Sequence, residues 1–157
     1  MLLCEHSMIT ILKNYIKEMM SIMPSTINNN YNNIKAYPKY GEIWYTNFGE
    51  QSGSKQGGIR PALIASNNIY NRFSPTITAI PISSRTYKKS PVHVFLSAGE
   101  VSGLYKDSII EVEKMQDIDK FQLIKKVGVL PKVKEREVAE KFTIQFPMLN
   151  MLQLVNA

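Results

Sequence analysis

The sequence predicts a mainly β domain with helices (α+β) that folds as a small, strongly bent barrel, preceded by an extra N-terminal helix. Short apolar segments recur at close spacing from about residue 39 onward, and Gly, Pro, Asn or Ser residues separate them. Helical spacing of three and four residues is found towards the two ends of the chain. Hydrophobic residues make up 44% of the 157 residues, which is enough for a sizeable core.

Residues 1–38 are predicted to form an amphipathic helix and an Asn-rich linker. Apolar residues recur on one helical face: Met8, Ile11, Leu12, Tyr15, Ile16, Met19 and Met20. Pro24 is expected to end the helix before the polar stretch PSTINNNYNNIKAYP. Lys13, Lys17 and Glu18 interrupt the apolar run well short of the roughly 20 residues of a membrane span, so no membrane partner is expected. Residues 39–157 are predicted to form the second domain.

The first half of the second domain is predicted to be built from short strands. These are expected at 41–48, 60–66, 76–84 and 90–96, with a turn or short helix at 67–75. In the first strand, Ile43 and Tyr45 are expected on one face, with Trp44 and Thr46 on the other.

The second half is predicted to hold a longer alternating strand at 108–118, a turn at 119–120 and a short strand at 124–130. The last periodic segment, 133–146, is predicted to be a helix. Its inward face is expected to consist of Val133, Val138, Phe142 and Ile144.

The net charge and the few Cys and His residues exclude some classes of function but do not select one. Lys and Arg number 19 against 13 Asp and Glu, a net charge of +6 that suits nucleic acid, an acidic protein or an anionic surface. Cys4 is the single cysteine, so no intramolecular disulfide can form, which fits a reducing cytoplasm. His6 and His93 are far apart and no ligand pair has a zinc-like spacing, so no metal or cofactor is expected. We interpret His93 as an outward or hydrogen-bonded strand histidine.

The segment GSKQGGIRP combines features of a phosphate-binding loop, although it lacks the GxxxxGK[ST] order of a P-loop. Gly57 and Gly58 carry no side chain, so another backbone can approach them closely. Ser54 and Gln56 can donate hydrogen bonds, and Arg60 presents a planar fork that matches a phosphate. The alternative interpretation of Arg60 is a surface arginine at a strand start, paired with a carboxylate.

A succession of motifs extends this pattern: GEIWYTNF, GSKQGGIRPALI, SNN, NRFSPT, AIPISS, SPVHVFL, GLYKDSII and EVEKMQDID, before a closing helix. From about Gly41 to Phe146 the chain resembles the MazF/PemK family of bacterial toxins, the RNA-cleaving half of toxin–antitoxin pairs. The resemblance implies an SH3-like barrel of the MazF/Kid/CcdB type and a cytoplasmic homodimer. It also implies metal-independent, sequence-specific cleavage of single-stranded RNA, as by an mRNA interferase. A cognate antitoxin would occupy the RNA groove, and operator DNA would be contacted only through it.

The resemblance also implies roles for individual residues. Arg60 matches the catalytic arginine of the family, Ser83 a position that contacts the scissile phosphate, and Glu113 an acidic position that serves as a base in some relatives. The residues expected to bind RNA are Ser54, Lys55, Gln56, Gly57, Arg85, Lys88 and Lys114.

Two positions depart from the family's pattern. Lys55 stands where the loop has an acidic residue, and Lys114 begins the triplet that replaces Gln-x-Arg. If the loop acid is the base, this chain has lost it; if Glu113 is the base, it has not. Two alternatives to an endoribonuclease therefore remain: a catalytically degenerate homologue that only binds RNA or DNA, and a gyrase-type inhibitor on the same fold.

Overall fold

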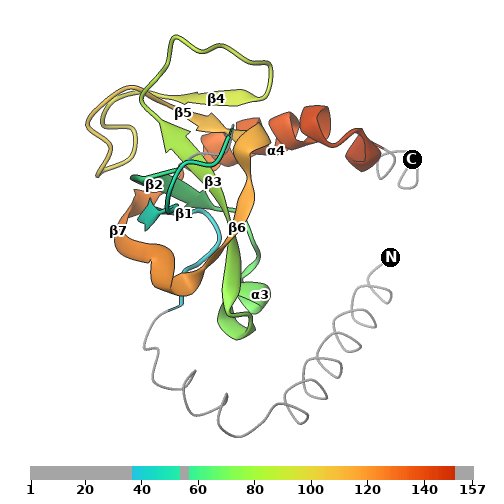
Figure 1. The fold of residues 1–157 in the computed structure, drawn as a ribbon. Coiled ribbons are helices and arrows are strands. Elements are labelled where there is room, and N and C mark those ends of the chain that lie inside the picture. The colour runs from blue at the N-terminus through green and yellow to red at the C-terminus, as the bar shows by residue number, and fades with distance from the viewer. Residues whose placement is uncertain (1–36, 54–56, 151–157) are drawn as a thin grey trace, which may run out of the picture. The chain divides into compact units, whose positions relative to one another are not determined.

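The computed structural model describes residues 37–53 and 57–150 (Figure 1). The helix and linker predicted before residue 37 lie outside these residues, as do Ser54, Lys55 and Gln56. The strands are β1 (Glu42–Asn47), β2 (Ile59–Ile64), β3 (Thr76–Ser83), β4 (His93–Leu96), β5 (Ser108–Glu111), β6 (Gln116–Asp119) and β7 (Leu123–Val129). The helices are α3 (Asn68–Phe73) and α4 (Lys132–Gln145), with 3-10 turns η1 (Val112–Lys114), η2 (Lys120–Gln122) and η3 (Pro147–Asn150).

The strands form one bent antiparallel sheet in the order β4-β5-β3-β2-β1-β7, and β6 pairs with β3 as well. Strand β3 is central because it bridges two parts of this sheet. Its first half pairs with β6 and its last two residues pair with β5, while β2 lies along its other edge. The prediction of a mainly β domain with helices is confirmed for the described residues.

The long strand predicted at 108–118 is wrong, because the chain turns a corner within it. Strands β5 and β6 pair with different ends of β3, and the 3-10 turn η1 at Val112–Lys114 separates them. The sequence alternates apolar and polar residues from Ile110 to Glu113, up to and into this turn, although every residue of β5 is buried. Alternation therefore could not distinguish one strand from two strands joined at a corner.

The core lies on both faces of the central strands, which explains their continuous apolar runs. In β3, Ile80 and Ile82 pack on one side with Leu63, while Ile77 and Ala79 pack on the other. The first cluster also takes residues from β4, β5 and α4, and the second is covered by Trp44, Phe48 and Leu123. Burial on both faces holds β2 and β3 in a fixed register, which matters because both strands carry predicted site residues.

Strand β1 keeps the predicted alternation of faces, since Ile43 belongs to the core cluster on one side of the sheet and Trp44 packs against the cluster on the other. Ile43 is wholly buried as expected, but so is Thr46, and Tyr45 is 37% exposed. The pairing of β1 with β7 shifts register after Ile43 and again after Tyr45. The extra residue lies on β7 each time, first Val127 and then Ile124, while β1 pairs with β2 without interruption. Thr46 is buried because the sheet is covered on both faces.

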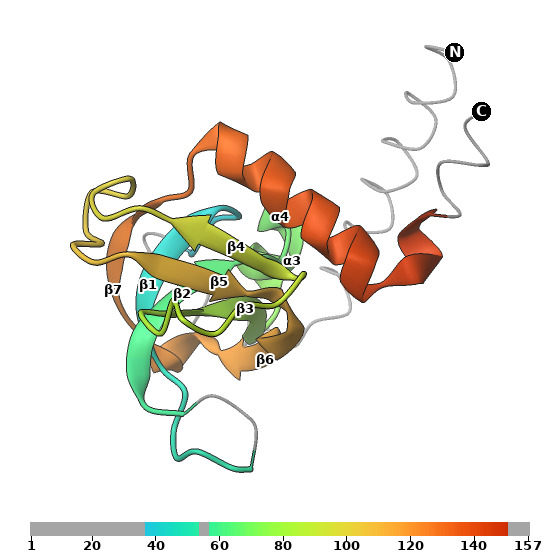
Figure 2. The same cartoon turned by 90° about the horizontal axis from the view of Figure 1, so that it is seen from above.

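Helix α4 packs against β4 and η1 (Figure 2). Val138 is buried and Phe142 lies against the same core cluster, as predicted. Val133 and Ile144, also predicted to face inward, are 75% and 50% exposed. At 3.6 residues per turn they lie roughly 140° and 120° around the helix from Val138, so they cannot share its face. No helix among the described residues is long and apolar enough to cross a membrane.

Candidate active site

A cavity of about 470 Å³ opens where the first residues of β2, the last of β3 and the start of β5 come together. Its walls are residues 59–61, residues 82–85, Tyr45 of β1, and residues 103–106 and 108 around the start of β5. The cavity therefore brings together Arg60, Ser83 and Arg85, three of the residues predicted from the sequence.

Arg60 and Ser83 meet because of the register between their strands. Strand β2 pairs antiparallel with β3 through Ala62↔Pro81 and Leu63↔Ile80. Extending this register by two residues places Arg60 opposite Ser83, with both side chains on the same face of the sheet. The Arg60 guanidinium donates a hydrogen bond through Nη2 to the carbonyl of Gly57, which fixes it at the mouth of the loop.

The structure requires a glycine at position 57 for a reason that differs from the one expected. A Cβ at this position would lie 2.4 Å from the backbone nitrogen of Gln51, so the loop closes only with glycine there. Gly58 takes a φ of +77°, and its amide donates to the carbonyl of Gly49 at 2.7 Å. The backbone that approaches Gly57 is thus the protein's own, and the closed loop presents a carbonyl to Arg60.

Ser83 is the last residue of β3, paired with Ile109 of β5 and only 6% exposed. Its Oγ accepts a hydrogen bond of 3.2 Å from the amide of Arg85. The oxygen acts as an acceptor in this contact, so the hydroxyl proton remains available for donation to a ligand oxygen.

The cavity carries positive charge. Arg60, Arg85 and Lys106 contribute cations to its walls, and none of the described residues that line it is acidic. A cavity with three cations and a hydroxyl donor suits a phosphate group. The same composition leaves no described carboxylate in place to accept a proton there.

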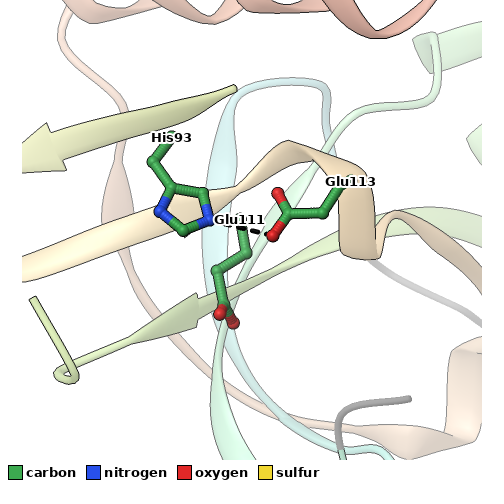
Figure 3. Close-up of side chains that lie close together, drawn as sticks. All are labelled: His93, Glu111 and Glu113. Carbon is green, nitrogen blue, oxygen red and sulfur yellow. Dashed lines mark hydrogen bonds and ion pairs between the residues drawn. The ribbon is translucent and has the colours of Figure 1, made fainter. Parts of the chain in front are cut away.

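Glu113 lies elsewhere. Strand β5 runs from Ser108 at the cavity towards Glu111, and Glu113 follows in η1, beyond the far end of the strand. Its Oε1 lies 2.8 Å from Nε2 of His93 (Figure 3), and Nδ1 of that ring is 2.9 Å from the carbonyl of Lys88. The interpretation of His93 as a hydrogen-bonded strand histidine is confirmed, whereas Glu113 is not brought to Arg60 and Ser83.

Three potential metal ligands, His93, Glu111 and Glu113, have donor atoms within 4.8 Å of one another. Both nitrogens of His93 are already engaged, and Figure 3 shows the Glu111 carboxylate turned away from the His93–Glu113 contact. A cation at this point would have to break that contact. The group is better described as a clamp between β4 and η1, named here the His93–Glu113 clamp.

Two further residues predicted to bind RNA, Lys88 and Lys114, lie outside the cavity wall. Lys88 meets the clamp through its carbonyl, and Lys114 ends η1. The sequence reasoning missed Lys106, Tyr45 and Tyr105, which do line it. A signal for Lys106 was present, since it directly precedes the DSII motif at the start of β5.

Comparison with known proteins identifies the family. Residues 39–146, more than half of the chain, match the sequence model of the PemK-like, MazF-like toxin of type II toxin–antitoxin systems. Endoribonuclease EndoA of Bacillus subtilis is 34% identical over 113 residues, covering 71% of this chain and 97% of its own. Endoribonuclease MazF of Staphylococcus saprophyticus is 36% identical over 99 residues, covering 62% of this chain and 82% of its own.

Solved structures agree with the sequence matches. MazF of Deinococcus radiodurans superposes with a TM-score of 0.63 at 27% identity, over 72% of this chain and 99% of that one. A MazE–MazF structure from the same organism gives 0.56 at 25% identity, over 71% and 96%. The fold class predicted from the sequence is therefore the one found in MazF structures, and the chain belongs to the PemK/MazF family of type II toxin–antitoxin toxins.

Proposed function

We propose that this chain is the toxin of a type II toxin–antitoxin pair and cuts single-stranded RNA without a metal ion. One observation carries the proposal: Arg60 and Ser83, the matches to catalytic positions of the family, line one cationic cavity. The names of the relatives, endoribonucleases EndoA and MazF, support the class of reaction.

The proposed reaction uses the ribose 2′-OH as the nucleophile, which restricts it to RNA. The 2′-oxygen loses its proton and attacks the adjacent phosphorus, the bond to the 5′-oxygen breaks, and the departing 5′-oxygen takes a proton from solvent water. The products are a 2′,3′-cyclic phosphate and a 5′-OH. Arg60 stabilises the negative charge that develops on the phosphate oxygens, and Ser83 donates a hydrogen bond to one of them. Arg60 is a poor proton donor because a guanidinium hardly deprotonates.

Glu113 was predicted to be the base that accepts the proton of the 2′-OH. Its position in the His93–Glu113 clamp, away from the cavity, favours a structural role instead. We therefore assign proton removal from the 2′-OH to solvent water in the open cavity. This assignment predicts that the reaction proceeds without Glu113.

A binding-only homologue is the second candidate, and one observation favours it. No described residue of the cavity wall is acidic, and Lys55 replaces the acid of the family's loop. Such a protein would hold RNA through Arg60, Arg85 and Lys106 and leave it intact.

The proposed partners follow from the family. A MazE–MazF complex is among the similar structures, so we propose a cognate antitoxin that covers the cavity, and a homodimer as the toxin. We place the protein in the bacterial cytoplasm and the toxin domain at residues 39–157, with the segment before it as a separate unit. Ser54, Lys55 and Gln56 remain proposed RNA contacts, outside the described residues.

The test is incubation of the purified full chain with a transcribed single-stranded RNA in EDTA. We expect discrete fragments whose 5′ ends accept phosphate from polynucleotide kinase without prior phosphatase treatment, as a 5′-OH end does. DNA of the same sequence is the matched control, because it lacks the 2′-OH and should stay intact. RNA that is bound but never cut would overturn the proposal in favour of the binding-only homologue, and DNA cut at equal rate would overturn the mechanism.

A further inference from the structure

Tyr105 is an exposed aromatic residue on the wall of the cavity. It lines the cavity beside Lys106, and 83% of its surface is open to solvent. A second tyrosine, Tyr45 of β1, lines the same cavity and is 37% exposed. Burial of an aromatic ring is favourable, so a ligand that covers an exposed ring on the cavity wall gains binding free energy.

The segment that carries Tyr105 is fixed on both sides of it. Val101 and Leu104, just before it, are 1% and 5% exposed and belong to the core. The loop between β4 and β5 lies beside β7 in both views (Figures 1 and 2). A Cβ at Gly103 would lie 2.5 Å from the Val127 side chain of β7, so the loop packs there only because this residue is glycine.

Hydrogen bonds hold the same loop. The amide of Gly99 donates to the carbonyl of Leu104 at 2.7 Å, and the amide of Ala98 donates to the Asp107 carboxylate at 2.9 Å. The backbone around Tyr105 is therefore positioned before any ligand binds. Preorganisation of this kind lowers the ordering cost of a contact that forms on binding.

We propose that the Tyr105 ring stacks on a nucleobase of the bound RNA, next to the phosphate that Arg60 and Ser83 hold. The inference rests on the proposed function and adds a base contact to it. Cations that follow the phosphates, combined with aromatic faces for the bases, are the general means of holding single strands. The cavity joins both, with Arg60, Arg85 and Lys106 as cations and Tyr105 as the exposed ring.

The experiment compares RNA binding by the wild type, Tyr105→Ala, Tyr105→Phe and Phe121→Ala. The probe is a fluorescein-labelled pool of random 20-nucleotide RNA with 2′-O-methyl riboses, which cannot be cut. Tyr105→Ala should weaken binding by roughly 5- to 150-fold, the range for loss of one stacked base, and Tyr105→Phe should bind as the wild type does. Phe121 is the matched control, since it is 85% exposed but lies outside the cavity wall, and its loss should change nothing.

A second measurement identifies stacking directly. One defined 2′-O-methyl RNA that the wild type binds, and cannot cut, is made with an abasic ribose at each position in turn. One position should weaken binding to the wild type by the factor lost in Tyr105→Ala, and should cause no further loss in that variant. A merely structural role of Tyr105 would weaken all the abasic RNAs equally in the variant.

Two outcomes would overturn the inference: wild-type affinity in Tyr105→Ala, or an abasic effect equally large with and without the tyrosine ring. Reduced binding of the antitoxin together with unchanged RNA binding would assign Tyr105 to the protein partner and overturn it as well. Failure of the proposed function is distinguishable, because it appears as absence of cleavage by the wild type, whereas the binding comparison uses an RNA that is not cut.

Discussion

The two ends of strand β5 differ in how their polar groups are used. At the Ser108 end, the cavity gathers Arg60 and Ser83 with further cations, and a hydroxyl proton remains available. Beyond the Glu111 end, the His93 ring is bonded on both nitrogens, one of them to Glu113. Beyond the Glu111 end the polar groups bond to one another and stabilise the fold, whereas at the Ser108 end they line a cavity that a ligand can enter. We propose that β5 has a reactive end at Ser108 and a structural end beyond Glu111.

The largest effect is expected from Arg60→Ala. Loss of one group that stabilises the transition state typically costs roughly 10²- to 10³-fold in rate, and we expect a loss of this size in RNA cleavage. The measurement is the single-turnover rate on one defined RNA. Arg136→Ala is the matched control, because Arg136 is an exposed arginine of α4 outside the cavity wall and should cut normally. Equal cleavage rates for the two variants would show that Arg60 does not stabilise the transition state.

A smaller effect is expected from Ser83→Ala. A hydrogen bond to a charged group contributes about 1.5–3 kcal/mol, so the cleavage rate should fall by roughly 10- to 150-fold. Ser83→Thr keeps the hydroxyl and should retain most of the rate. If Ser83→Thr were as slow as Ser83→Ala, packing of this buried position would explain the loss better than hydrogen bonding.

At the structural end, a double-mutant cycle should measure the clamp. His93→Ala, Glu113→Ala and the double variant are compared by urea unfolding, and we expect a coupling free energy of roughly 0.5–3 kcal/mol, the range for residues in direct contact. The 2.8 Å contact and the low exposure of His93, 9% for its side chain, favour a measurable value. Additive single effects would mean that the contact does not stabilise the fold.

The smallest effect concerns pH and Glu42, which lies in neither region. Burial alone would raise the pKa of Glu42, but hydrogen bonds from Lys126, the Lys39 amide and Trp44 together hold it below its ordinary value of 4.5. A carboxyl with a lowered pKa adds stability above its ordinary pKa, and that stability is lost as pH falls through the folded value. Unfolding free energy should therefore fall less steeply below pH 4.5 in Glu42→Gln than in the wild type. Parallel curves would exclude this contribution.

The sequence was sufficient for strands β2 and β3, which carry Arg60 and Ser83. Motif order and alternation predicted the positions of β2 and β3, and the family pattern selected Arg60 and Ser83, which the register of these strands brings together. Two-sided burial fixes that register, so local pattern and tertiary structure agree here.

The sequence was insufficient where the chain turns a corner. A single strand from 108 to 118 leaves the position of Glu113 relative to the cavity undefined, and the 3-10 turn at Val112–Lys114 could not be inferred from alternation. Tyr105 was missed because nothing local marks an exposed tyrosine as part of a cavity wall. Its neighbourhood is created by distant β7, which packs against Gly103.

The most direct test of the separation between the two ends is the single-turnover rate of RNA cleavage by Glu113→Gln in EDTA. This variant removes the carboxylate charge and changes few atoms, and circular dichroism and urea unfolding establish that it is folded. We predict a rate within a few-fold of the wild type, because Glu113 lies outside the cavity and is bonded to His93. A folded Glu113→Gln that loses cleavage as fully as Arg60→Ala would contradict this, and would make Glu113 the proton acceptor after all.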